Sequence, residues 1–134
     1  MPTPKDRARA LVVSRLFLAL NRETNSHFLD GGILGASSDD LIICLALFVG
    51  QSESRPFTAG KLATYVGIPR ATVTRRLSAL RENRVVRQDD AGWWSVALDR
   101  DAVFNALCAI NVATAQHIKN AAKKLSILDT SPIA

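Results

Sequence analysis

Apolar residues recur at the spacing of two short helices near the middle of the chain. Residues 59–66 carry one narrow apolar face, and residues 70–82 carry Val73, Leu77 and Leu80 at i, i+4 and i+7. Because residues at this spacing share one side of a helix, the pattern predicts two amphipathic helices that face a common core.

Residues that favour helix ends separate these two segments. Thr58 can cap the first helix, Gly67 can end it in the left-handed conformation, and Pro69 suits the entry to the second. The connection is therefore short, and the two segments form a predicted helix-turn-helix.

A period-two pattern follows the second helix. In residues 85–88 and 93–98, side chains for the two faces of a strand alternate, which predicts two strands. Residues 89–92 are expected to form the turn of the hairpin between them. The alternation places Trp94 in the core and Trp93 on the other face. Residues 55–57 are positioned to add a short third strand.

Longer apolar segments flank this unit. Residues 6–22 predict a helix after a loose end in which Pro2 and Pro4 oppose helix, and residues 99–125 predict a long helix followed by a tail. Both end helices have apolar faces wider than one small core needs, which favours packing against a partner subunit. Between them, residues 37–49 predict a buried helix, and the apolar residues of the connection before it are expected to pack on the core (Phe28, Leu29, Ile33 and Leu34).

These elements predict a mainly α fold with a small β-hairpin, in the α+β class. We expect a single domain over residues 1–134, with a winged helix-turn-helix flanked by N- and C-terminal helices. Its parts are an N-terminal helix and connection (6–36), the winged helix-turn-helix (37–98) and a C-terminal helix and tail (99–134).

The exposed side of the second helix combines small and basic side chains. Small residues let a helix enter the major groove, about 12 Å wide, and arginine can bind guanine in a bidentate manner. The alternative interpretation is a solvated face whose arginines serve only solubility. The residues on and beside this face are Arg70, Ala71, Thr72, Thr74, Arg75 and Ser78.

The charge of the chain is concentrated in the same region. Residues 55–88 contain eight Lys or Arg residues and one acidic residue, a net +7, whereas the remainder of the chain is −2. A basic surface segregated in this way is what neutralisation of DNA phosphates requires.

These residues together resemble the winged helix-turn-helix of bacterial regulators, most closely the MarR-type and related families. The motif that carries the resemblance consists of Ala63, Gly67, Val73, Arg75, Leu77 and Leu80. The resemblance implies that the second helix enters the major groove and that the wing contacts the neighbouring backbone. By position, the implied base or phosphate contacts are Arg70, Thr72, Thr74 and Arg75, and the implied phosphate contacts are Lys61, Arg76 and Arg87.

Three positions depart from the family pattern. Arg76 occupies a position that is usually apolar, and Asn83 and Arg84 replace a glycine, with asparagine able to take the left-handed conformation. The wing turn is acidic, at Asp89 and Asp90, so we expect a reduced or absent wing contact with DNA.

The sequence therefore predicts a sequence-specific regulator of transcription that binds double-stranded DNA. MarR-type proteins interleave their terminal helices as dimers, and two recognition helices about 34 Å apart would read a palindrome, so we expect a homodimer. One alternative is a winged helix that binds protein and serves in assembly. Another is a repressor that responds to a small-molecule effector.

Other classes of function find little support. Cys44 and Cys108 lie in apolar helical segments and are expected to be free core thiols, with a redox-sensing thiol as the alternative. His27 and His117 have no metal-ligand spacing. No arrangement of nucleophile and base is recognisable, so we expect no enzyme, cofactor or metal. Arginines interrupt any secretory signal, no segment is apolar enough to span a membrane, and we expect a cytoplasmic protein.

Overall fold

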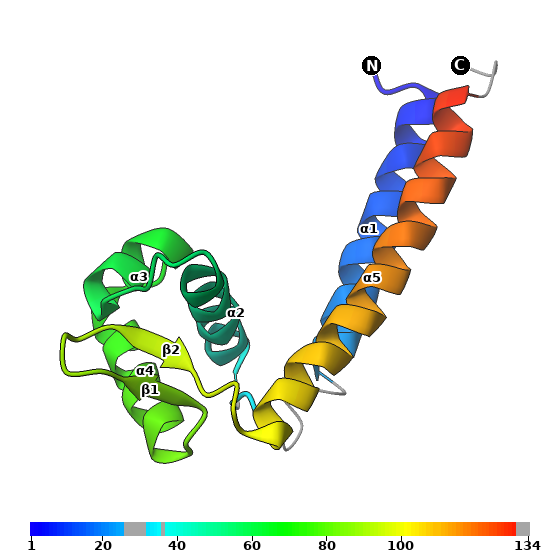
Figure 1. Cartoon of the computed structure of the whole chain (residues 1–134). Helices are drawn as coiled ribbons and strands as arrows, with labels where there is room; N and C mark the ends of the chain where they lie inside the picture. The colour runs from blue at the N-terminus through cyan, green and yellow to red at the C-terminus, as the bar shows by residue number, and fades with distance from the viewer. Residues whose placement is uncertain (26–31, 36, 131–134) are drawn as a thin grey trace.

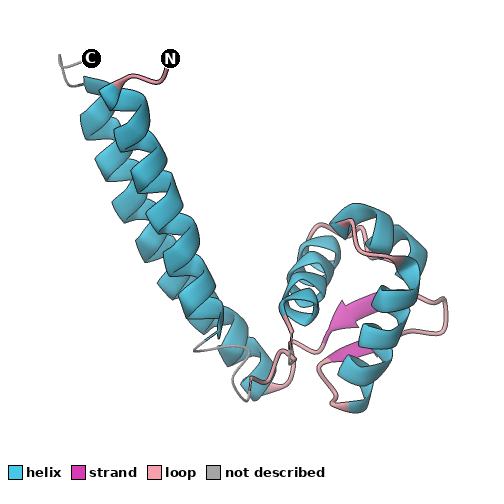
Figure 2. Cartoon of the chain, turned by 180° about the vertical axis from the view of Figure 1, so that it is seen from behind, coloured by secondary structure: helices cyan, strands magenta, loops and turns pink. Residues whose placement is uncertain are grey.

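The computed structural model of this chain describes residues 1–25, 32–35 and 37–130. Figure 1 shows a head formed by residues 38–96, from which two long helices, Pro4–Thr24 and Asp101–Thr130, extend side by side as an arm. Figure 2 shows the same arrangement from behind. The mainly helical architecture with one antiparallel hairpin confirms the predicted winged helix-turn-helix fold. The elements are α1 (Pro4–Thr24), α2 (Ser38–Ser52), α3 (Ala59–Val66), α4 (Arg70–Glu82), β1 (Val86–Gln88), β2 (Trp94–Val96) and α5 (Asp101–Thr130).

Helix α1 begins earlier than the sequence pattern predicted. The Thr3 hydroxyl accepts a hydrogen bond from the Asp6 amide at 3.1 Å, and the Asp6 carboxylate accepts one from the Thr3 amide at 2.8 Å. Pro4 sits in the first turn, where a missing N–H leaves no helical bond unmade. The expectation that Pro4 opposes helix was wrong for this reason.

Helix α5 ends later than predicted. The helix continues through the residues assigned to a tail as far as Thr130, and residues 131–134 lie outside the described part of the chain. Near its end, Asp129 accepts a hydrogen bond from Nη2 of Arg9 at 2.6 Å. Packing against α1 gives these last turns a neighbour that the local sequence pattern could not reveal.

The two central helices occur where they were predicted. Thr58 caps α3 by accepting a hydrogen bond from the Lys61 amide at 3.3 Å, and Gly67 ends it with φ 71°. In α4 the three apolar residues at helical spacing, Val73, Leu77 and Leu80, are buried.

The left-handed residue after α4 is Arg84, with φ 60°, rather than Asn83, with φ −82°. The Val85 amide donates to the Leu80 carbonyl at 2.9 Å and the Arg84 amide to the Arg81 carbonyl at 3.0 Å, which is a Schellman closure. This closure requires the left-handed conformation at Arg84, so the ability of Asn83 to take that conformation is not used.

The hairpin is shorter than predicted but keeps the expected inner face. Val86 pairs with Val96 and Gln88 with Trp94, and Trp94 is buried. The predicted third strand is reduced to one bridge, in which the Trp94 amide donates to the Phe57 carbonyl at 2.9 Å.

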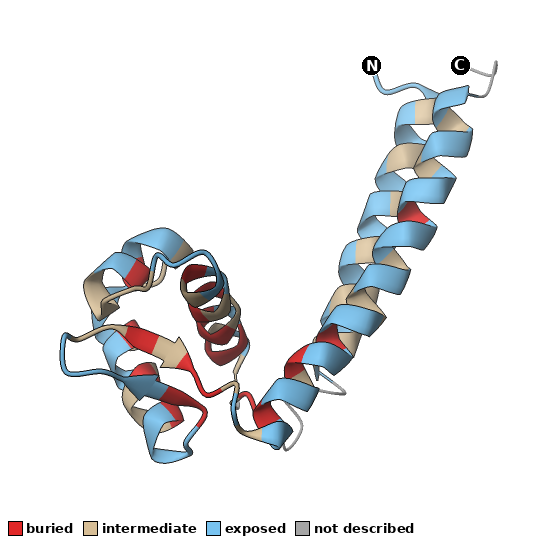
Figure 3. Cartoon of the chain, viewed as in Figure 1, coloured by how far each residue is buried: buried red, intermediate tan, exposed pale blue. Residues whose placement is uncertain are grey.

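Buried residues gather in the head and at the base of α5 (Figure 3). Leu34, before α2, is buried as predicted, whereas Ile33 is exposed, and Phe28 and Leu29 lie outside the described residues. Cys44 is buried, and burial raises the pKa of its thiol to about 12. Cys108 is exposed instead of lying in the core, because α1 covers a different side of α5.

The packing of α2 against the connector that follows it leaves no room at Gly50. A β-carbon there would lie 2.8 Å from the Arg55 carbonyl oxygen and 2.8 Å from the Phe57 ring. We therefore expect Gly50→Ala to lower the free energy of unfolding by about 1–3 kcal/mol, measured by urea denaturation. Gly60→Ala is the control, since its β-carbon would meet no atom closer than 3.7 Å, and an equal loss in both variants would contradict the packing argument.

Candidate nucleic-acid interface

The side of α4 opposite its buried residues is open to solvent. Ala71, Thr74 and Arg75 are exposed there, and Ser78 is half-buried. Arg75 stands at the centre of this side, with small residues one turn before and one turn after it. The side chains around its guanidinium therefore project only a short distance from the helix. That shape fits insertion into a major groove.

A groove runs beside this face, between α3, α4 and the wing. It brings together Lys61, Arg70 and Thr74, which the sequence had assigned to DNA contact. The Arg70 guanidinium lies over Gly60. A β-carbon placed at Gly60 would lie 3.7 Å from the guanidinium carbon of Arg70. The groove therefore has cationic groups from both helices of the helix-turn-helix.

Arg81 lines the same groove, and the sequence reasoning missed it as a site residue. Its guanidinium carbon lies 5.4 Å from the centre of the Trp94 ring, and Nη1 donates to the Gln88 side chain at 3.4 Å. Arg70, Thr74 and Arg81 fall at i, i+4 and i+11, a spacing that aligns them along one edge of α4. This spacing is the feature of the sequence from which Arg81 could have been identified as a site residue.

Lys61 also contacts the wing. Its Nζ lies 5.2 Å from the centre of the Trp93 ring, an arrangement with cation–π geometry. Trp93 is half-buried and packs under this ammonium group, which gives a structural reason for its position outside the core.

Arg76 has a protein partner on α2. Its Nε donates to Oδ1 of Asp40 at 2.6 Å and its Nη2 to Oδ2 at 2.5 Å, a bidentate pair that raises the pKa of the guanidinium. Asp40 is 0% exposed, and Arg76 retains 28% exposure of its side chain. The related families usually have an apolar residue at this position. The structure explains why this chain has Arg76 there, since Arg76 neutralises a buried carboxylate. Thr72, on the same edge of α4, is half-buried, and neither residue lines the groove.

Arg87 is paired as well, but at the surface. Its Nη1 lies 2.6 Å from Oδ1 of Asp99 and its Nη2 donates to Oδ2 at 2.9 Å. These hydrogen bonds raise the pKa of Arg87 and lower that of Asp99. Arg87 also borders a shallow basic recess on the side of the wing next to the end of α4, lined by Arg81, Arg84, Val86, Arg87, Gln88 and Arg100.

The acidic wing turn is organised by one of its own carboxylates. Oδ1 of Asp89 accepts hydrogen bonds from the Ala91 amide at 3.0 Å and the Trp93 amide at 2.9 Å. This carboxylate closes the turn, so the acidic residue at this position has a structural role.

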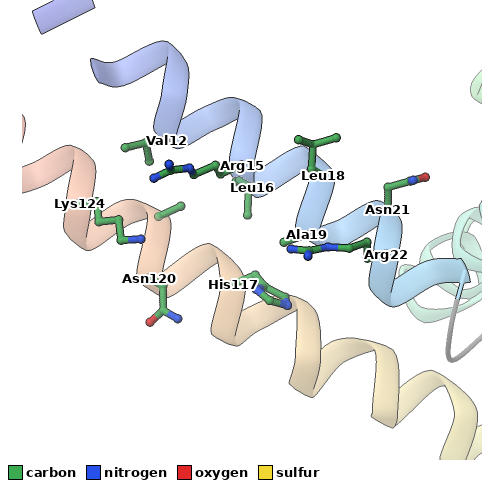
Figure 4. Close-up of a pocket in the computed structure, with 11 residues that line it drawn as sticks. Val12, Arg15, Leu16, Leu18, Ala19, Asn21, Arg22, His117, Asn120 and Lys124 are labelled. Atoms are coloured by element: carbon green, nitrogen blue, oxygen red, sulfur yellow. The ribbon is translucent and has the colours of Figure 1, made fainter. Parts of the chain in front are cut away.

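A second groove lies on the arm, between α1 and α5. Its floor is apolar, and Arg15 and Lys124 stand at its rim (Figure 4). Leu16 and His117 point into the space between the helices, and His117 lies 3.1 Å from the Glu23 carboxylate. This groove is part of the arm and not of the helix-turn-helix.

Residues 51–90 match the family model described as the IclR helix-turn-helix domain. The match supports a helix-turn-helix transcriptional regulator. The IclR family is a different winged-helix family from the MarR-type one, and the match extends to neither α1 nor α5. No curated protein and no solved structure matches the chain.

Two further observations concern the described residues alone. None of their helices has the length and apolar character that crossing a membrane demands. In the same ranges, no three His, Cys, Asp or Glu side chains are grouped so that they could hold a metal ion.

Proposed function

We propose that this protein is a sequence-specific regulator of transcription that inserts α4 into the major groove of double-stranded DNA. The observation that carries the proposal is the exposed face of α4 around Arg75, with the groove of Lys61, Arg70 and Arg81 along its edge. Side chains on the face can reach base edges, and the cations in the groove can reach the adjacent phosphates. The proposal assigns no catalytic activity and implies a cytoplasmic location.

The proposal gives the predicted site residues different roles. Arg75, Arg70 and Thr74 contact bases or nearby phosphates, and Lys61 and Arg81 contact phosphate. Arg76 positions α4 through Asp40, and Thr72 lies at the margin of the contact. The geometry that supports these assignments is the exposure of the first group and the ion pair of Arg76.

We also propose a homodimer, as in the MarR-type plan of terminal helices. The support is the amount of apolar surface on the arm, where Phe17 is 70% exposed and Leu11 and Leu18 are also exposed. Several large apolar side chains exposed on one element are typical of an interface between subunits. A second copy would supply a second α4 and allow a palindromic site to be read.

The small-molecule effector stays a prediction. In the described chain, the groove between α1 and α5 combines an apolar floor with the cationic groups of Arg15 and Lys124. Those features suit an apolar molecule that carries an anionic group.

Selection of bound fragments from random duplex DNA tests the proposed function. We expect enrichment of a motif with two related half-sites, and an affinity that falls steeply as the salt concentration rises. An affinity for duplex DNA that is undetectable at low salt would contradict the proposal. It would favour the alternative of a winged helix that binds protein.

The pair of Arg87 and Asp99 allows a matched test of the wing. We expect Asp99→Asn to release Arg87 and to tighten binding to all duplexes, because the variant frees a guanidinium and removes a carboxylate that repels phosphate. Arg87→Ala should weaken binding to all duplexes alike, measured by fluorescence anisotropy. A loss restricted to one sequence would contradict the assignment of Arg87 to phosphate.

A further inference from the structure

One exposed side of α5 carries a coiled-coil repeat. The repeat lies on a different side of the helix from its buried residues, Val103, Leu107, Ile110 and Ala121. Its members follow one another at alternating spacings of four and three, which is the heptad pattern of helices that pair. This α5 seam consists of Phe104, Cys108, Asn111, Ala115, Ile118 and Ala122, all of them exposed.

The apolar members of the α5 seam are too exposed to be explained by the fold of one chain. Phe104 is 49% exposed and Ile118 is 48% exposed, and Val112, which adjoins the seam at its middle, is 74% exposed. No described element of the chain covers these side chains, so only another molecule can bury them.

We infer that the α5 seam packs against the same seam of a second copy, with the two helices antiparallel. Asp101 stands at one end of the seam, and Lys119 and Lys123 stand near the other. A parallel pair would bring like charges together at both ends. An antiparallel pair places each Asp101 near the lysines of the partner and also opposes the two helix dipoles.

The side-chain sizes fix the register of this antiparallel pair. In an antiparallel heptad pairing, each position a faces a position d of the other helix. Phe104 then faces Ala122, Ile118 faces Cys108, and each large side chain meets a small one. The twofold axis then lies at the level of residue 113, where Asn111 faces Ala115, and the two copies of Val112 flank the axis about 3 Å apart along the pair.

This register also sets how far apart the two heads join the paired helices. The first residues of the two α5 helices, next to the heads, are about 36 Å apart along the pair, from a rise of 1.5 Å per residue. Half-sites on successive turns of DNA are about 34–36 Å apart. This agreement rests on the proposed DNA-reading function, whereas the interface itself does not.

Sedimentation equilibrium of the full chain tests the α5 seam. We expect a dimer, and we expect Val112→Glu to raise its dissociation constant by roughly 100-fold or more, because the carboxylates of the two copies would lie close together beside the axis. Ala109→Glu, exposed on α5 but outside the seam, should leave the mass unchanged. A monomeric chain, whether another protein or nothing covers the seam, would overturn the inference, as would a dimer insensitive to Val112→Glu.

Oxidative cross-linking tests the direction and register. The two copies of Cys108 would be about 15 Å apart along the antiparallel pair, too far for a disulfide, whereas Ile118→Cys would place a new thiol opposite Cys108. We expect covalent dimers from Ile118→Cys and none from the unaltered chain or from Ile118→Cys combined with Cys108→Ser. Ready cross-linking of the unaltered chain through Cys108 would indicate parallel helices and overturn the inference. If the chain is a monomer that still binds duplex DNA, the dimer interface at the α5 seam is ruled out, whereas the proposed binding of DNA is not.

Discussion

Replacing Arg76 by alanine is expected to lower the free energy of unfolding by about 3–5 kcal/mol. The substitution removes the guanidinium that faces Asp40, a carboxylate with 0% exposure. A buried carboxylate that loses its cationic partner is one of the costliest single changes in a folded protein. Chemical denaturation of the variant and of the unaltered chain measures the difference.

A double variant separates the ion pair from the general effect of truncating a side chain. Asp40→Leu combined with Arg76→Met removes both charges, and we expect most of the loss to disappear. A deficit of about 1 kcal/mol should remain, since Asp40 also caps α2 by accepting a hydrogen bond from the Ser37 amide at 3.3 Å. If Arg76→Ala leaves stability unchanged and weakens DNA binding alone, Arg76 contacts phosphate as first predicted, and the positioning role is wrong.

Replacing Arg75 by alanine is expected to cost about 1–3 kcal/mol of binding to the selected DNA site. Arg75 is exposed at the centre of the open side of α4, so the loss should occur without a change in stability. Competition between the selected duplex and a scrambled one measures how much of this cost is specific to sequence.

The control for Arg75 is another exposed arginine far from the head. Arg7, on α1, carries the same charge, so Arg7→Ala tests whether a change in net charge alone weakens binding. Equal losses in the two variants, or an unchanged sequence preference in Arg75→Ala, would exclude Arg75 from base contact.

The helix-turn-helix was predictable because its signals are local. Thr58, Gly67 and the spacing of Val73 and Leu77 act within a few residues of one another, and the structure confirms each of them. The start of α1 was equally local, but the capping box of Thr3 and Asp6 was overlooked in favour of the prolines.

The contacts of the site residues could not be predicted in the same way. Asp40 stands at the start of a helix, where an acidic residue has a local explanation, and its partner Arg76 is distant in sequence and meets it only when α2 packs on α4. The exposure of Cys108 likewise depends on which side of α5 is covered by α1. Both features follow from the packing of helices, which a periodic pattern does not specify.

The central claim is that the exposed face of α4 and the groove beside it contact DNA. Amide chemical-shift changes in the ¹⁵N-labelled full chain, on addition of the selected duplex, map the contact directly. We predict the largest changes from Arg70 to Ser78 and around Lys61 and Arg81, with smaller ones along the arm. Changes confined to α1 and α5, with the α4 face unaffected, would contradict this claim.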